Sequence, residues 1–452
     1  MTTALFADLA FTSTGWQRDV RLELTSGVIS SVTASAPARP GDERVGCLIP
    51  GLPNLHSHAF QRGMAGLAEW RGPGSDDFWS WREVMYKFAH TMSPDQMEII
   101  ATQAYVEMLE SGFTRVGEFH YLHHDSDGRA YADIGEMASR ICAAAAVTGI
   151  GLTLLPVFYA HGNFGAVPAT PGQRRFITSL DCFVRLLDRC EAYARGLEAA
   201  LVGVAPHSLR AVTPEELVDL AGLRPNAPIH MHISEQTKEV DDCLAWCGRR
   251  PVAWLLDTTP VDGRWCLVHA THMDGDETKR LAASGAVAGL CPVTEANLGD
   301  GIFNSEDFQA ADGRYGVGTD SNILISAADE LRQLEYAQRL RERRRNVLAT
   351  SGASSGTTVF SRALQGGSQA LGVAGLGIAA GGRADLVGLD LADAAFAGST
   401  PPRLVDAWIF AARRPISAVW VGGKRVVTDG RHHRRSETLT QYRRVVAELL
   451  SD

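Results

Sequence analysis

The chain has 452 residues, and its 43 lysines and arginines against 52 aspartates and glutamates give a formal net charge of −9. Hydrophobic residues make up 45% and charged residues 21% of the sequence, which excludes disordered, collagenous and coiled-coil proteins and favours one large globular domain with a smaller one. The net negative charge gives the protein no overall positive electrostatic field that would attract polyphosphates, so we expect no nucleic-acid partner.

Both ends of the chain predict short β-strands. The predicted strands cover residues 20–24, 28–32, 384–389, 418–421 and 424–427. Gly422 and Gly423 separate the last two strands and are typical of a β-hairpin. Because similar material opens and closes the chain, we expect residues 1–48 and 373–452 to form one small β-sandwich domain.

Residues 49–372 alternate apolar runs with amphipathic stretches, a rhythm typical of an α/β protein with parallel strands and outer helices. The candidate strands cover residues 47–55, 115–119, 152–159, 201–205, 229–233, 265–270, 286–291 and 315–318. Eight such units predict a (β/α)8 TIM barrel. A doubly wound open sheet has the same rhythm, but the sequence offers neither a glycine-rich dinucleotide fingerprint in the first unit nor a phosphate loop.

The cysteines and the apolar segments indicate the compartment. Eight scattered cysteines are too few for a disulfide scaffold, which favours a reducing, cytoplasmic location. Residues 1–21 have no basic start and no long apolar stretch, so we expect no secretory signal. Residues 141–160 carry no charge over a length that can span a bilayer. Gly149, Gly151 and Pro156 interrupt this segment, so we favour a helix end followed by a strand and expect no membrane partner.

Three further patterns are interpreted as structural. Cys243 and Cys247 have a spacing that suits a metal, but no second pair follows them, which favours a half-buried helix. Residues 339–345 are strongly basic and end an apparent helix, where cations complement the helix dipole. His432 and His433 lie among arginines, which is typical of an exposed loop or tail.

The first chemical motif lies at the end of the first candidate barrel strand. Residues 53–58 contain His56 and His58. Side chains two residues apart in an extended segment point to the same side, so both imidazoles can face one metal ion. A His-x-His pair also arises by chance, so this motif alone is a weak signal.

The second motif closes the fifth candidate strand. Of His230 and His232, we select His232 as the metal ligand because it lies at the end of the strand, beside Glu235. A carboxylate three residues further along can deliver and accept protons without binding the metal. The alternative is a packed core histidine with a glutamate that caps a helix.

His269 and Asp320 complete the set. Each ends an apolar strand run, where a polar group is out of place in a packed core but typical of a site at the carboxyl end of a barrel strand. A ligand set of imidazole nitrogens and a carboxylate suits one Zn²⁺ best, with Fe²⁺ and Mn²⁺ as alternatives.

Together these motifs resemble the amidohydrolase superfamily over nearly the whole chain. The resemblance depends on residues 50–58, 318–320 and 381–387 and on the strand-five and strand-six histidines. It implies a metal-dependent hydrolase of the mononuclear deaminase branch. Binuclear members usually bridge two metals with a lysine from strand four, and residues 201–210 contain no lysine.

Within that branch, residues 56–63, 77–82 and 291–301 are similar to the enzymes of bacterial histidine degradation that hydrolyse N-formimidoyl-L-glutamate to N-formyl-L-glutamate and ammonia. The similarity implies a cytoplasmic homodimer. It implies metal ligation by His56, His58, His232 and Asp320, substrate contacts from Gln61, Arg82, Tyr121, His207 and Arg210, and acid/base roles for Glu235, His269 and Asp320.

The chemistry of these side chains agrees with a small dicarboxylate substrate. Arg82 and Arg210 can form forked hydrogen bonds to its two carboxylates, although either arginine can also be a solvated surface residue. Glu235 and Asp320 are natural neighbours for the protonated amidine at the other end. We expect Asp320 to take a proton from water, His269 to orient the nucleophile, and Glu235 to relay a proton to the departing nitrogen.

Three alternatives stay open. The nearest is another aminohydrolase of the same branch, acting on guanine, cytosine, an S-adenosyl nucleoside or a triazine. The others are a metal-free barrel that serves as a scaffold and a protein with a purely structural zinc site. Residues 70–86, which include Trp79 and Trp81, are interpreted as a lid over the substrate or as a subunit contact.

Overall fold

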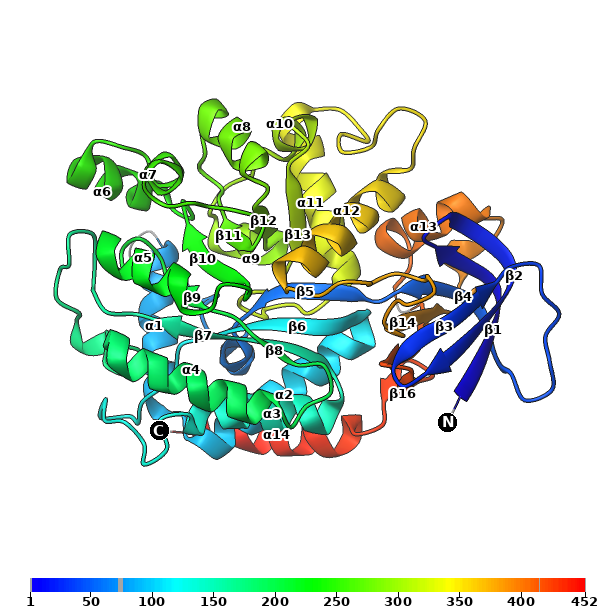
Figure 1. The fold of residues 1–452 in the computed structure, drawn as a ribbon, viewed down its shortest axis with the longest axis horizontal. Helices are drawn as coiled ribbons and strands as arrows, with labels where there is room; N and C mark the ends of the chain where they lie inside the picture. The colour runs from blue at the N-terminus through cyan, green and yellow to red at the C-terminus, as the bar shows by residue number, and fades with distance from the viewer. Residues whose placement is uncertain (1, 72–75, 414, 452) are drawn as a thin grey trace.

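The parallel strands of the middle of the chain lie in two sheets (Figure 1). The structure is a computed structural model that describes residues 2–71, 76–413 and 415–451. The first sheet has the order β5 (Leu52–Ser57), β6 (Phe113–His120), β7 (Gly151–Phe158), β8 (Leu201–Val202), with β9 (Ala205–Pro206) also paired to β7. The second has the order β10 (Ile229–Ile233), β11 (Trp265–His269), β12 (Val287–Leu290), β13 (Arg314–Val317). The chain is therefore a mixed α/β protein with parallel sheets.

The two parallel sheets meet at both of their outer edges. A single parallel bridge joins Ser57 to Asp320, and another joins Val204 to Ile229. The amide of Asp320 donates to the carbonyl of His56 over 3.0 Å, and the amide of His58 donates back to the carbonyl of Asp320 over 2.9 Å. The carboxyl ends of β5 and β13, which are far apart in the sequence, are thereby held side by side.

Most of the predicted strands agree with the observed ones, with two corrections. The predicted strand over residues 201–205 is divided into β8 and β9. The expectation of a single strand over residues 47–55 is wrong, because β4 (Glu43–Pro50) pairs in the terminal sheet and β5 starts the parallel one. Gly51 lies between them, and a Cβ atom there would lie 2.2 Å from the side chain of Thr114. The chain passes from one sheet to the other at a point where β6 leaves no room for a side chain.

Helices follow most of the parallel strands and pack outside them (Figure 1). Several begin with signals that the sequence carries: Ser93 and Thr213 form capping boxes, and a proline occupies the next position in each case. The helices are α1 (Phe78–Thr91), α2 (Pro94–Ser111), α3 (Glu136–Thr148), α4 (Leu180–Ala194), α5 (Pro214–Leu223), α6 (Thr237–Cys247), α7 (Pro251–Thr258), α8 (Gly275–Ser284), α9 (Pro292–Leu298), α10 (Ser305–Ala310), α11 (Ala327–Glu342) and α12 (Ser355–Ala370), and a 3₁₀ turn, η1 (Ala59–Met64), follows β5.

Both ends of the chain contribute strands to one further sheet. Its order is β17 (Arg431–His432), β16 (Lys424–Thr428), β15 (Ile416–Val421), β14 (Leu386–Leu389), β4, β1 (Thr2–Thr12), β2 (Gly15–Thr25), β3 (Val28–Thr33). The predicted hairpin joins β15 to β16, where Gly422 and Gly423 adopt φ of 53° and 73°. The short helix α13 (Leu404–Phe410) precedes β15, and α14 (Arg435–Leu449) runs back along α2 (Figure 1).

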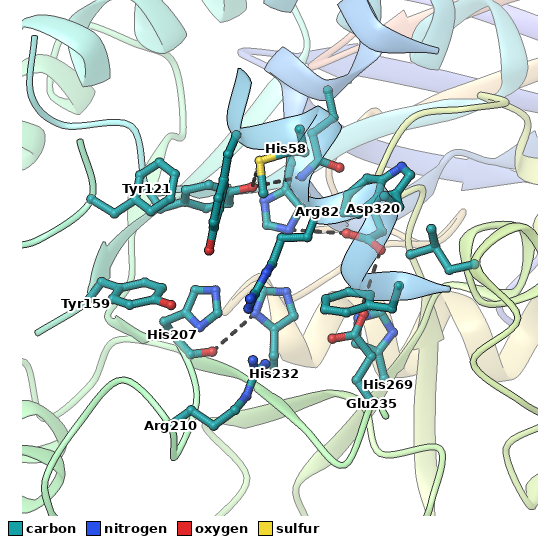
Figure 2. A pocket seen from close by; sticks show the side chains of 17 residues that line it. His58, Arg82, Tyr121, Tyr159, His207, Arg210, His232, Glu235, His269 and Asp320 are labelled. Carbon is teal, nitrogen blue, oxygen red and sulfur yellow. Dashed lines mark hydrogen bonds and ion pairs between the residues drawn. The ribbon is translucent and has the colours of Figure 1, made fainter. Parts of the chain in front are cut away.

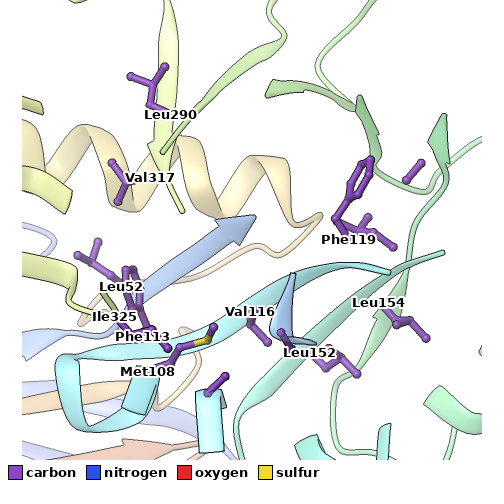
Figure 3. Close-up of a cluster of buried hydrophobic side chains, with 14 of the residues drawn as sticks. Leu52, Met108, Phe113, Val116, Phe119, Leu152, Leu154, Leu290, Val317 and Ile325 are labelled. Carbon is purple, nitrogen blue, oxygen red and sulfur yellow. The ribbon is translucent and has the colours of Figure 1, made fainter. Parts of the chain in front are cut away.

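Apolar side chains from the strands and helices fill the interior (Figure 3). Leu52, Val116 and Leu152 come from consecutive parallel strands and are fully buried, and Met108 reaches them from α2. The uncharged segment 141–160 divides as predicted, because α3 ends at Thr148 and β7 begins at Gly151. Within the described ranges, the helices are too short or too polar to cross a lipid bilayer.

The structural interpretations of three other patterns have mixed outcomes. Cys243 and Cys247 lie on α6, the first buried and the second half-buried, which confirms the helix prediction. The basic residues from Arg339 end α11, also as predicted. The expectation of an exposed His432 is wrong: the side chain is buried, and its ring hydrogen-bonds to the carbonyl of Thr148 over 2.9 Å. Pairing of β17 with β16 carries it inward.

We predict that Arg115→Met lowers the free energy of unfolding by about 2–4 kcal/mol. The guanidinium of Arg115 is buried on β6 and donates to the carbonyls of Leu152 and Ala199 over 2.9 and 2.7 Å, so its loss removes two charge-assisted hydrogen bonds made by a buried side chain. Urea unfolding followed by circular dichroism measures the change. Arg18→Met, at an exposed position of β2, is the control and should be neutral; equal effects of the two variants would contradict the prediction.

Candidate active site

Four predicted metal ligands converge where the parallel strands end. His56 and His58 lie at the end of β5, His232 lies on β10, and Asp320 follows β13. One ligand atom from each of them falls within 4.8 Å of all the others, and all four side chains are buried. The Nε2 atom of His56 is 3.2 Å from that of His58 and 3.0 Å from that of His232. The Oδ1 atom of Asp320 is 3.4 and 3.2 Å from Nε2 of His56 and His58.

Close contact between the first and last parallel strands produces this convergence. Gly318 passes so near β5 that a Cβ atom there would lie 2.7 Å from the backbone of His56. Asn54 and Thr319 exchange hydrogen bonds of 2.7 and 3.0 Å below the site. The side-chain Nδ2 group of Asn322 also donates to the backbone carbonyls of His58 and Asp320. This network holds both strand ends in one register.

The protonation states suit a cation. The Nδ1–H group of His58 donates to the carbonyl of Phe119 over 2.9 Å, and that of His232 donates to the carbonyl of His207 over 3.2 Å. These bonds fix the tautomers, so the Nε2 lone pairs point to the shared centre. Burial lowers the pKa of His56 to about 3 and also lowers the pKa of His232. Neutral imidazoles with converging lone pairs are the form that binds a divalent metal, so the residues present fit such an ion.

His269 and Glu235 lie beside this cluster (Figure 2). The Nε2 atom of His269 is 3.6 Å from Oε1 of Glu235 and 4.0 Å from Oδ2 of Asp320. Burial alone lowers the pKa of His269, but Glu235, Glu295 and Asp320 outweigh it and raise this pKa to about 10. Burial also raises the pKa of Glu235. The pair can therefore hold and move a proton next to the metal ligands.

The backbone at the strand ends is strained. Ser234, His269, Ala270, Asp320 and Asn322 adopt φ values of 50°, 67°, 49°, 43° and 55°. Each left-handed conformation costs a non-glycine residue about 1–2 kcal/mol. Strain in three strand-end loops turns polar side chains out of the sheets and toward one point, which is typical of functional sites.

A cavity opens over these groups. The five predicted substrate-contact residues line it together with His58, His232, Glu235, His269 and Asp320; they are Gln61, Arg82, Tyr121, His207 and Arg210. Gln61 donates to the hydroxyl of Tyr121 over 2.8 Å, and His207 hydrogen-bonds to the hydroxyl of Ser208 over 3.0 Å. Residues from η1 and α1 and from the ends of β6 and β10 therefore surround one space.

Two guanidinium groups enter the cavity (Figure 2). Arg82, on α1, lies over the rings of Trp79 and Tyr86, with its Cζ atom 4.4 and 5.4 Å from their centroids. Arg210 is 8% exposed and approaches the carboxylate of Glu239 only to 3.8 Å. The buried Nε–H donors of both arginines have no hydrogen-bond partner among the described residues. Donors of this kind are matched by an anionic ligand.

Two residues of the site, Glu295 and Tyr159, were not predicted from the sequence. Glu295, at the start of α9, accepts a hydrogen bond from the backbone of Cys291 and lies 3.3 Å from Nδ1 of His269, so it orients that ring. Tyr159 lines the cavity from the end of β7. The sequence pattern around Glu295 and Tyr159 was a weak indication of a functional role, because a glutamate in a helix and a tyrosine after a strand are common structural residues. Within residues 70–86, α1 forms one wall of the cavity, while residues 72–75 lie outside the described ranges.

Sequence comparison identifies the class of protein. Residues 47–426 match the model of the amidohydrolase family, and residues 2–46 match that of the formimidoylglutamate deiminase HutF N-terminal domain. The chain belongs to the amidohydrolase family.

Individual relatives are similar over almost the entire length. The formimidoylglutamate deiminase of Pseudomonas aeruginosa is 50% identical, covering 99% of this chain and 100% of that protein. The crystal structure of an amidohydrolase from Brucella melitensis superposes with a TM-score of 0.96 at 54% identity, covering 99% of this chain and 100% of that one. The 8-oxoguanine deaminase of Pseudomonas aeruginosa is 28% identical over 85% of this chain and 82% of that protein.

We predict that His232→Ala reduces the transition-metal content of the purified protein by 10-fold or more, because one of four converging ligand groups is lost. Elemental analysis by mass spectrometry measures this content. His230→Gln is the matched control: His230 lies two residues away, its ring hydrogen-bonds to the carbonyl of Ala370 over 2.7 Å, and a glutamine amide can replace that bond. Metal retention in His232→Ala, or equal loss in both variants, would contradict the assignment.

Proposed function

We propose that this protein hydrolyses N-formimidoyl-L-glutamate to N-formyl-L-glutamate and ammonia, a step of histidine degradation, with one Zn²⁺ held by His56, His58, His232 and Asp320. The observation that carries the proposal is the polarity of the cavity: converging metal-ligand groups and Glu235 lie at one end, and the guanidinium groups of the half-buried Arg82 and the buried Arg210 enter it. The formimidoylglutamate deiminase relative supports the choice of substrate.

The arginines favour a dicarboxylate over a purine or pyrimidine. Arg82 covers the face of Tyr86, a cavity-lining ring that a planar base would otherwise use for stacking. Arg210 lies in the cavity wall with Glu239 as a distant counter-ion. Two substrate carboxylates would supply the acceptors that both guanidinium groups lack, and Gln61, Tyr121 and His207 are proposed to complete the contacts.

At the metal-binding end of the cavity, the carboxyl groups of Asp320 and Glu235 accept and donate the protons of the reaction. When bound, Zn²⁺ supplies Lewis-acid chemistry that makes water a nucleophile at neutral pH. Asp320 presents Oδ1 to the ligand histidines and Oδ2 to His269, and Oδ2 takes the proton of the attacking water. The Nε2 of His269 stabilises charge as the tetrahedral centre forms, with Glu295 holding the opposite ring nitrogen.

Glu235 completes the proton transfer. Its carboxyl group, 3.6 Å from Nε2 of His269, passes a proton to the terminal nitrogen of the tetrahedral centre, the nitrogen that does not carry the glutamate. The C–N bond to that terminal nitrogen breaks and ammonia departs. The Glu235 carboxylate then takes the remaining proton of the former water oxygen, which becomes the formyl carbonyl. Burial keeps bulk water away from Glu235, so the proton goes to the leaving group.

The same proposal extends to the architecture and the setting. We infer that the two parallel sheets form one (β/α)8 barrel over residues 49–372, which the bridges at both sheet edges support. We infer that residues 1–48 and 373–452 form one small β domain, because their strands share one sheet, and the β-sandwich form of this domain is proposed from the family resemblance. A cytoplasmic homodimer is proposed from the family resemblance, and Fe²⁺ or Mn²⁺ are the alternatives to Zn²⁺.

We expect the zinc-loaded protein to release ammonia from N-formimidoyl-L-glutamate with a kcat/KM that exceeds its values for guanine and cytosine. Arg82→Met and Arg210→Met should each lower kcat/KM by about 10- to 100-fold, because each removes a charged hydrogen bond to the substrate. A coupled glutamate dehydrogenase assay measures ammonia. A higher kcat/KM on either base would overturn the substrate, and inactivity on all three after zinc addition would favour a scaffold.

Glu235→Gln should lower kcat by about 10² or more while the metal content stays at the wild-type level. The amide keeps the size of the side chain but cannot relay a proton. Steady-state kinetics and elemental analysis of the same preparation separate these effects. Turnover at the wild-type rate would mean that the relay is assigned to the wrong residue.

A further inference from the structure

The hydroxyl group of Tyr159 has an orientation that its neighbours determine. Tyr159 follows β7, is 5% exposed and lines the cavity. Behind it, the buried amide of Gln173 donates from Nε2 to the Tyr159 hydroxyl oxygen over 2.7 Å. On its other side, Oε1 of Gln173 accepts from the backbone N–H of Thr170 over 2.7 Å and from its hydroxyl over 3.2 Å.

These contacts leave the proton of Tyr159 available. A backbone N–H can only donate, so the atom of Gln173 that faces Thr170 must be the oxygen, and the atom that faces Tyr159 must be the NH₂ group. An amide nitrogen does not accept hydrogen bonds, so the tyrosine oxygen is the acceptor and its own O–H is not used in this contact. The hydroxyl is thus oriented as a donor for a ligand in the cavity.

Tyr159 lies on the side of the cavity away from the reacting groups. In Figure 2, Tyr159 and His207 lie at one side of the view, whereas Glu235, His269 and Asp320 lie at the other. The ring of Tyr159 is 4.4 Å from that of His207, centroid to centroid. Arg210, whose side chain is buried, lines the same cavity. A hydroxyl donor and a buried cation therefore face one space, which is a suitable combination for a carboxylate.

We propose that Tyr159 is a specificity-determining residue that donates a hydrogen bond to the side-chain carboxylate of the substrate, and that Gln173 is the positioning residue that orients its hydroxyl. This inference rests on the proposed function. The formimidoyl carbon must lie near Glu235 and His269, and the α-carboxylate is attached one carbon from the amidine nitrogen. The γ-carboxylate lies two carbons further along, so it is the group that reaches the Tyr159 side of the cavity.

The test is a cycle between variants and truncated substrates. The zinc-loaded wild-type and Tyr159→Phe proteins are assayed for ammonia release from three compounds: N-formimidoyl-L-glutamate, N-formimidoyl-L-2-aminobutyrate, which lacks the γ-carboxylate, and 4-formimidoylaminobutyrate, which lacks the α-carboxylate. On the first and third compounds, Tyr159→Phe should lower kcat/KM by about 10-fold or more, mainly through KM. On the second compound the two proteins should be equal within about 2-fold.

Two further variants separate orientation from folding. Gln173→Leu should show the same dependence on the γ-carboxylate with a smaller loss, because the tyrosine hydroxyl remains but is no longer held. Tyr336→Phe, at an exposed position on α11, should match the wild type on all compounds. Thermal unfolding and metal content of every variant identify any that are misfolded.

The outcomes distinguish this inference from the proposed function. Equal kinetics of wild type and Tyr159→Phe on N-formimidoyl-L-glutamate would overturn the role of Tyr159 alone. An equal loss on all three compounds would overturn it as well, because the residue would then be structural. A wild-type protein that is inactive on N-formimidoyl-L-glutamate would overturn the proposed function and this inference with it.

Discussion

The structure depends on the contact between the ends of β5 and β13. Backbone hydrogen bonds between His56 and Asp320, the side-chain amide of Asn322, and a glycine at 318 bring two segments together that are more than 250 residues apart in the sequence. Without that contact, the histidine pair and the aspartate would belong to separate strands with no common centre. The strain at Asp320 and Asn322 persists because the paired strand ends fix both residues from several sides.

Charge is arranged along the cavity in a way that suits its proposed substrate. Anionic and metal-binding groups gather at one end, and guanidinium groups with unmatched donors enter the cavity. Buried charges of this kind are unfavourable unless a partner arrives, because low-polarity surroundings penalise an unpaired ion. A ligand with a cationic amidine and two carboxylates would neutralise the charges at both ends of the cavity at once. Its binding would therefore supply the charge partners that these buried groups lack in the folded protein.

Positioning groups extend the site beyond the residues that touch the substrate. Glu295 holds one nitrogen of His269 so that the other faces Glu235 and Asp320. Phe119 and His207 present backbone carbonyls that fix the tautomers of His58 and His232. Gln173 acts in the same way on Tyr159. In each case, a group that can only accept or only donate a hydrogen bond fixes the orientation of the neighbouring side chain. The rigid scaffold thereby determines where that side chain directs its proton or its lone pair.

Local sequence determined much of this protein. Periodicity located the parallel strands and the hairpin at Gly422, and histidines at the ends of apolar runs pointed to a metal site, because strand period and burial leave a direct pattern in the residues. The tertiary structure decided what depends on contacts between distant segments. It divided the predicted first strand at Gly51, where Thr114 leaves no space for a side chain, and buried His432 by pairing β17 with β16. Glu295 and Tyr159 entered the site only through folding, since a single carboxylate or hydroxyl has no sequence signature until a distant partner gives it a direction.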